Sequence, residues 1–180
     1  MNLSDKRLAL FASIEPGVAF WSREIAERGI DAVYAKITSR GYDTVKYAAL
    51  NEKISQFDVA SARKAIDNAG GIFISSDDLD WPVAVNELEV PPLGLIIKGD
   101  VELLSERSLA IVGTRNPTPY GIRIAGDFAA GFVDREWAIV SGGAYGIDTA
   151  AHRGALVAEG RTIAVIASGI DIGYPAGNAR

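Results

Sequence analysis

Apolar positions in the first 70 residues recur at the spacing of short amphipathic helices. We predict a first helix carrying Leu8, Leu10, Phe11 and Ile14, capped by Ser4 or Asp5, and further helices over residues 18–28, 30–39, 45–50 and 57–68. Glycines follow several of these segments, as at helix ends. Helices this short are stable only when packed together. We therefore expect a small helical domain over residues 1–70.

The remainder of the chain alternates between strand-like and helical patterns. Strands are predicted over residues 72–75, 93–98, 109–112, 137–140 and 162–167, and helices over residues 120–134 and 148–158. Such alternation is typical of βαβ units with a parallel sheet, and right-handed crossovers lead us to expect helices on both faces. The strands at 109–112 and 137–140 read as buried on both faces.

These patterns predict an α/β fold, in which a Rossmann-like parallel sheet over residues 71–180 follows the helical domain. Three strands with their helices make only half of a doubly wound sheet. We therefore expect the chain to be the N-terminal part of a longer core.

Charge and composition narrow the possible functions. The net charge of the 180 residues is −5, and the excess of acid lies in residues 1–103, with 11 Lys and Arg against 16 Asp and Glu; residues 104–180 hold 7 of each. Any phosphate contact must then come from a local cluster or from backbone N–H groups, since nucleic-acid binders usually carry a basic excess. The chain has no Cys, which excludes thiol catalysis and Cys-based zinc sites. Without a long apolar run or a signal peptide, we expect a cytoplasmic protein with no membrane partner.

A first candidate site follows the strand at 109–112. Gly113 lets the chain turn closely past a ligand, Thr114 offers a hydroxyl, and Arg115 offers a planar set of donors suited to phosphate. Turns of this kind lie at the carboxyl ends of parallel strands, where ligands bind. The alternative is a plain turn in which Arg115 pairs with a carboxylate.

A second candidate turn follows the strand at 137–140 and opens a helix. Its sequence, Ser141-Gly142-Gly143-Ala144-Tyr145-Gly146, does not match the dinucleotide fingerprint, so an NAD site is poorly supported. Backbone N–H groups at a helix N-terminus remain a ready anion site, and the alternative is a turn needed only for packing. Tyr145 could stack on a base or pack on the sheet edge, and the sequence does not decide between these.

Asp148 and His152 stand four residues apart and share a helix face. They could act as general acid and base, but no nucleophile stands at a fixed spacing, so we favour structural roles, with Asp148 capping the helix. His152 is the only histidine, which excludes a multi-His metal site. Asp77 and Asp78 are interpreted as a solvated turn, so no metal is expected.

Together these motifs resemble the DNA-processing protein A (DprA/Smf) family. They are VGTR at residues 112–115, PYG at 119–121, SGGAYGIDTAAHRGAL at 141–156 and TIAVIASGIDIGYP at 162–175. The resemblance is strong over residues 106–175 and weaker over 72–103. The region 1–70 is similar to the variable, SAM-like N-terminal domain of that family.

The resemblance implies a Rossmann-like core that binds single-stranded DNA, protects incoming DNA during natural transformation and helps load the RecA recombinase. It also implies a homodimer, no cofactor and no enzymatic activity. Carried over to this sequence, one wall of a phosphate-binding pocket is Gly113, Thr114 and Arg115. The other wall is Ser141, Gly142, Gly143 and Gly146, with Tyr145 beside them and Asp148 and His152 as supports.

Two other interpretations remain open. The first is a nucleotide-processing phosphoribohydrolase of the lysine-decarboxylase-like kind, which also places a glycine-rich turn before a helix but needs a later PGG-x-GT-x-x-E segment that this chain lacks. The second is a degenerate module whose helical domain only recruits partners.

Overall fold

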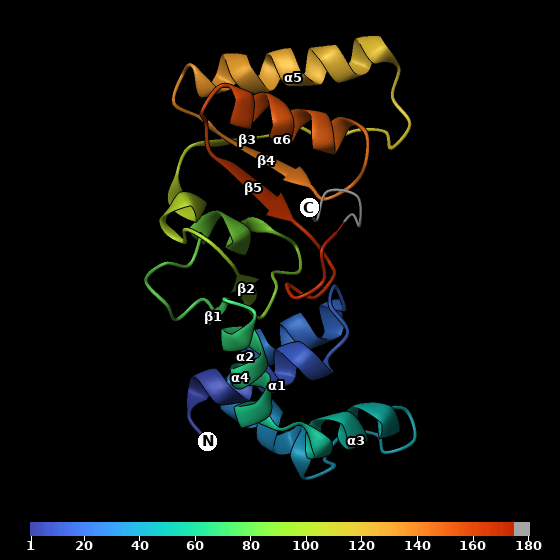
Figure 1. Cartoon of the computed structure of the whole chain (residues 1–180). Coiled ribbons are helices and arrows are strands. Elements are labelled where there is room, and N and C mark those ends of the chain that lie inside the picture. Colours follow the sequence, from blue (N-terminus) through green and yellow to red (C-terminus); the bar gives the residue numbers. More distant parts are fainter. Residues whose placement is uncertain (175–180) are drawn as a thin grey trace. The chain divides into compact units, whose positions relative to one another are not determined.

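The computed structural model describes residues 1–174 and divides into two compact units, Met1–Gly99 and Asp100–Arg180 (Figure 1). Pro175, the last residue of the final motif, lies outside the described residues. Within residues 1–174, no helix is both long and apolar enough to cross a bilayer. The predicted division at residues 70 and 71 falls between the last helix of the first unit and its first strand, and it stays a prediction.

The first unit begins with the expected helices: α1 (Leu3–Ser13), α2 (Ala19–Thr38), α3 (Ala48–Gln56) and α4 (Val59–Asn68). The predicted caps of α1 are wrong, because the Asn2 side chain accepts the Asp5 N–H, at 2.8 Å. Ser4 and Asp5 lie inside the helix instead. The predicted interruption at Gly29 is present as a break within α2, where φ is 80°.

The carboxylate of Glu24, on α2, has three polar neighbours that lower its pKa. The Tyr42 hydroxyl donates to Glu24, and Arg28 and Lys36 lie beside the same carboxylate. The hydrogen bond from Tyr42 holds the pKa of Glu24 below its ordinary value; desolvation opposes this shift, and Arg28 and Lys36 add to it. Glu24 therefore anchors α2 to the following turn.

Two short antiparallel strands complete the first unit. β1 (Ile72–Ile74) pairs with β2 (Leu95–Ile97), and a 3-10 turn, η1 (Val83–Glu87), lies between them in sequence. Asp78 accepts the N–H and the hydroxyl of Ser75, while Asp77 pairs with Arg7 at 2.6 Å. Asp78 thus stabilises the turn after β1, and Asp77 ties that turn to Arg7 of α1.

The second unit is built from a 3-10 turn, η2 (Glu102–Ser105), and two βαβ crossovers. β3 (Ser108–Ala110), α5 (Pro119–Val133), β4 (Ala138–Gly142), α6 (Ile147–Val157) and β5 (Thr162–Val165) follow in order. The strands are parallel in the order β3-β4-β5, with Leu109 beside Ile139 and Ile139 beside Thr162. Helices α5 and α6 cover the same face of the sheet (Figure 1).

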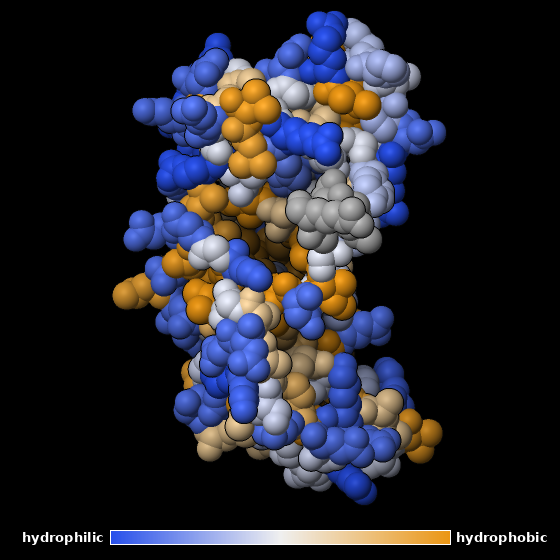
Figure 2. All heavy atoms as spheres, viewed as in Figure 1, coloured by the Kyte–Doolittle hydropathy of each residue, from blue (hydrophilic) through white to orange (hydrophobic). Residues whose placement is uncertain are grey.

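The expectation of helices on both faces is therefore wrong. Both crossovers step in the same direction across the sheet, so the right-handed rule places both helices on one side. In the run 137–140, the expectation of full burial is met at Ala138 and Ile139, whereas Trp137 and Val140 are half-buried. It fails for residues 109–112, since Ala110 and Val112 are exposed. Within residues 1–174, β3 pairs with β4 alone and so lies at the edge of its sheet, and α5 and α6 cover one face. Ile122 and Phe128 of α5 are also exposed, and hydrophobic residues remain visible on the surface over α5 and α6 (Figure 2).

Small residues allow α5 and α6 to pack closely. The buried cluster beneath them is Ala129, Ile139, Ala151 and Ala155. A Cβ atom at position 154 would lie 2.5 Å from the carbonyl oxygen of Gly126, so only glycine fits there. This close packing fixes α6 over β4, and with it the turn that precedes α6.

Gly154→Ala is expected to lower the free energy of unfolding by about 1–3 kcal/mol, because the new methyl group meets rigid backbone of α5. Urea-induced unfolding measures the change. Gly126→Ala is the matched control: its Cβ would lie 3.8 Å from the nearest atom, the Ala150 carbonyl oxygen. That variant should be neutral or more stable by up to about 1 kcal/mol. Equal effects of the two substitutions would contradict the packing argument.

Candidate functional site

The two turns singled out in the sequence lie side by side and are joined through their backbones. The Ile147 N–H donates to the Thr114 carbonyl at 3.2 Å. Gly146 has a φ of 92°, and a Cβ there would lie 2.3 Å from the same carbonyl oxygen. A Cβ at Gly113 would lie 2.7 Å from the Ile147 side chain. Glycine is therefore required on both sides of the joint.

The turn after β3 presents an exposed cation. Thr114 Oγ1 accepts the Asn116 N–H at 3.2 Å, which tightens the turn around Arg115. Arg115 is exposed and forms no ion pair or hydrogen bond with any residue in the described range 1–174. The alternative in which a carboxylate pairs with Arg115 is thus not realised there.

Buried side chains hold the turn after β4 in place. Ser141 is buried, and its hydroxyl donates to the Ile111 carbonyl, tying together the ends of β4 and β3. A Cβ at Gly143 would lie 2.8 Å from the Tyr174 ring. Tyr145, in the middle of the turn, is 52% exposed. In this structure Ser141 supports the turn, whereas Tyr145 is accessible to a ligand.

Helix α6 begins at this turn and supplies its remaining supports. Gly146 occupies the N-cap position, so the predicted cap role of Asp148 is wrong. Asp148 lies in the first helical turn, is 7% exposed, and accepts the Ala144 N–H at 3.3 Å. One turn later, His152 contacts Gly142 and Thr162. The two residues thus brace the glycine turn from its buried side.

This arrangement suits the binding of an anion. An exposed guanidinium stands at the joint of two glycine turns and beside a helix N-terminus, where backbone N–H groups favour negative charge. The Ser141 hydroxyl is buried and donates to the Ile111 carbonyl, and the Thr149 hydroxyl donates to the Ala144 carbonyl. The geometry of these turns therefore supports binding more directly than group transfer.

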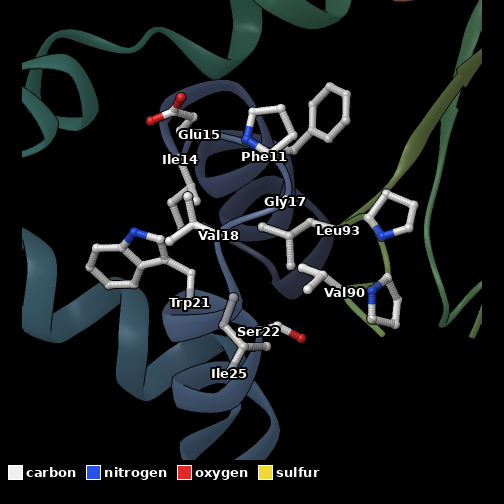
Figure 3. Close-up of a pocket in the computed structure, with 13 residues that line it drawn as sticks. Phe11, Ile14, Glu15, Gly17, Val18, Trp21, Ser22, Ile25, Val90 and Leu93 are labelled. Atoms are coloured by element: carbon white, nitrogen blue, oxygen red, sulfur yellow. The ribbon is translucent and has the colours of Figure 1, made fainter. Parts of the chain in front are cut away.

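A cavity of about 230 Å³ in the first unit offers different chemistry. It lies between the α1–α2 turn and the segment before β2, and Phe11, Val18, Ile25 and Leu93 are among its lining residues (Figure 3). Glu15 and Ser22 are the polar members of this lining apart from the Trp21 ring. A hydrocarbon surface of this kind suits apolar groups, not phosphates.

Comparison with known proteins gives this chain a family. Residues 72–180 match the family model described as DNA recombination-mediator protein A. The chain belongs to this family. The predicted resemblance is thereby confirmed, and so is the α/β fold with helical and Rossmann-like parts.

Curated relatives and solved structures agree with the match. A Mycobacterium tuberculosis relative is 41% identical over 160 residues, which cover 76% of this chain and 41% of the relative. The DNA processing protein DprA of Bacillus subtilis is 40% identical over 139 residues, covering 76% of this chain and 47% of that protein. The chain therefore spans less than half the length of these relatives.

Two structures share the fold. The X-ray structure of DprA from Streptococcus pneumoniae superposes with a TM-score of 0.77 at 29% identity, over 97% of this chain and 61% of that one. A DprA structure from Helicobacter pylori, described for its single-stranded DNA binding mode, gives a TM-score of 0.50 at 29% identity, over 60% of this chain and 48% of that one.

Sequence reasoning brought together the two turns but missed the residues that join and support them. Ile147, Thr149 and Thr162 were not expected to contribute, although Thr149 Oγ1 donates to the Ala144 carbonyl at 2.8 Å. These residues contribute through contacts with other parts of the chain, and a local sequence pattern does not reveal such contacts. The assignment of individual binding residues stays a prediction.

Gly146→Ala is expected to separate the two turns, because the methyl group meets the Thr114 carbonyl and the positive φ disfavours alanine. We expect a loss of at least about 2 kcal/mol in the free energy of unfolding, measured by urea titration. Gly17→Ala is the control: Gly17 also has a positive φ of 80°, but no atom lies within 4 Å of its Cβ position. A loss no larger than that of Gly17→Ala would contradict the interlocked turns.

Proposed function

We propose that this chain binds single-stranded DNA at the joint of the two glycine turns, as part of a DNA-processing, recombination-mediator protein. The observation that carries the proposal is Arg115, an exposed cation without a partner in residues 1–174, placed beside the N-terminus of α6. The family match and the single-stranded DNA binding described for the Helicobacter pylori structure support it.

The residues of the two turns have separate roles in this proposal. Arg115 contacts a phosphate through its guanidinium group, and Thr114 and Gly113 shape the backbone on the first wall. The second wall is formed by Gly142, Gly143 and Gly146, held by Ser141, Asp148 and His152. Tyr145 offers an accessible ring on which a base stacks.

The wider role follows the family. We propose that the protein acts without catalysis, protects incoming single-stranded DNA, helps load the RecA recombinase and works as a homodimer in the cytoplasm. Phosphate contacts by backbone and Arg115 give little sequence preference, because base edges are not read. That property suits a protein that must accept any incoming strand.

Fluorescence anisotropy of a labelled oligo-dT, titrated with this chain at low and moderate salt, tests the proposal. Arg115→Ala is expected to weaken binding by about tenfold and to reduce the salt dependence by about one phosphate contact, since the cation that neutralises that phosphate is removed.

Arg153→Ala is the matched control. Arg153 is exposed on α6 and, like Arg115, forms no ion pair or side-chain hydrogen bond with residues 1–174. The Arg153→Ala substitution removes the same charge at a position outside the two turns, so it should change the affinity for oligo-dT little. Equal losses in both variants would point to general electrostatic attraction. Absence of oligo-dT binding even at low salt would overturn the proposal, and release of base from a nucleoside monophosphate would then favour the phosphoribohydrolase.

A further inference from the structure

The start of α5 lies against the joint of the two glycine turns. A Cβ at Gly121 would lie 3.6 Å from Cδ1 of Ile147, the residue whose N–H joins the second turn to Thr114. The same Ile147 side chain lies 2.7 Å from the position that a Cβ would take at Gly113. Both helices therefore begin beside one side chain, at the same end of the unit (Figure 1). The first turn of α5 thus borders the proposed anion site.

Tyr120 presents an aromatic ring from this first turn. It is 66% exposed, so its ring contributes little to the packing of the helix. Its backbone is nevertheless held firmly: Thr118 is the N-cap of α5, and its Oγ1 accepts the Gly121 N–H at 3.2 Å. Pro119, the first residue of the helix, has a φ fixed by its own ring. An accessible ring on a fixed backbone is suited to stacking on a planar ligand.

Arg123 brings a cation to the same ring. Its guanidinium carbon lies 5.6 Å from the centroid of the Tyr120 ring, one helical turn along α5. Within residues 1–174, the ion pair of Arg123 is with Asp127, at 3.7 Å, and both side chains are exposed. Such an exposed pair holds its members weakly. The guanidinium is therefore available to a phosphate next to the ring.

The ring lies within reach of a strand held at Arg115. Tyr120 follows Arg115 by five residues, so their Cα atoms are at most about 17 Å apart. A stacked strand rises by about 3.4 Å per nucleotide, so about five nucleotides or fewer cover this distance. Pro117 and Pro119 restrict the backbone between the two residues. One short strand can therefore contact both Arg115 and the Tyr120 ring.

We propose that Tyr120 and Arg123 form a nucleotide subsite beside the joint of the two glycine turns. An unpaired base stacks on the Tyr120 ring, and Arg123 contacts the adjoining phosphate. The inference rests on the proposed DNA-binding function and adds selectivity to it. Arg115 and backbone N–H groups can hold the phosphates of a duplex as well as those of a single strand. A ring can stack only on a base whose face is free, so the subsite favours single strands.

The experiment compares two labelled probes by fluorescence anisotropy: oligo-dT of about 12 nucleotides, and an oligonucleotide of the same length in which every site is abasic. Tyr120→Ala is expected to weaken oligo-dT binding by about tenfold, because a stacked base loses its platform. The same substitution should leave the affinity for the abasic probe unchanged. Tyr120→Phe keeps the ring and should bind oligo-dT like the unmodified chain.

Arg123→Ala should show a different pattern, because it removes a phosphate contact. We expect it to weaken the binding of both probes by about threefold and to reduce the salt dependence by about one phosphate contact. For a DNA duplex, whose bases are already stacked, Tyr120→Ala should leave the affinity unchanged. The preference for single strands over duplex then falls by the factor that oligo-dT binding loses.

Phe128→Ala is the matched control. Phe128 is also an exposed aromatic residue of α5, two turns beyond Tyr120, and its loss should leave oligo-dT binding unchanged. Unchanged oligo-dT affinity in Tyr120→Ala, equal losses on the two probes, or an equal loss in Phe128→Ala would overturn the subsite while the DNA-binding function stands. Absence of oligo-dT binding by the unmodified chain would overturn the function and the subsite together.

Discussion

The site depends on one backbone hydrogen bond, from the Ile147 N–H to the Thr114 carbonyl. It joins the turn after β3 to the turn that opens α6, and it forms only because Gly146 leaves room for that carbonyl. The turn that carries Arg115 is thereby fixed relative to the helix N-terminus. An anion held at this joint would meet both features at once.

The supports of this joint come from small residues packed at close range. Gly154 lets α6 approach α5, and alanines fill the space between these helices and β4. Such packing leaves little freedom for α6 to shift. The polar groups behind the turn are then held by the same helix: Asp148 at Ala144 and His152 at Gly142. The close packing of α5 and α6 therefore also fixes the position of the glycine turn that α6 supports.

Sequence patterns predicted the elements of the second unit well, because each strand ends at a glycine turn and each helix has the length of a crossover. They failed where an outcome depends on neighbours in space. Burial of residues 109–112 was overestimated since periodicity does not say which strand lies at an edge, and the side taken by α5 and α6 follows from strand order. The Asn2 cap was missed because Ser4 and Asp5 are equally good capping residues by type. The two turns were found from sequence, whereas the roles of Ile147 and Thr162 exist only in three dimensions.

The net acidity of the chain does not contradict the proposed phosphate site. Attraction at a distance depends on total charge, whereas affinity at contact depends on the few charges that face the ligand. Here the excess acid lies in residues 1–103, and residues 104–180 are balanced. In a balanced unit, the exposed Arg115, which has no ion-pair partner within residues 1–174, supplies the positive charge beside the glycine turns. The site is therefore set by the local geometry around Gly142 and Thr114, and little by the charge of the chain as a whole.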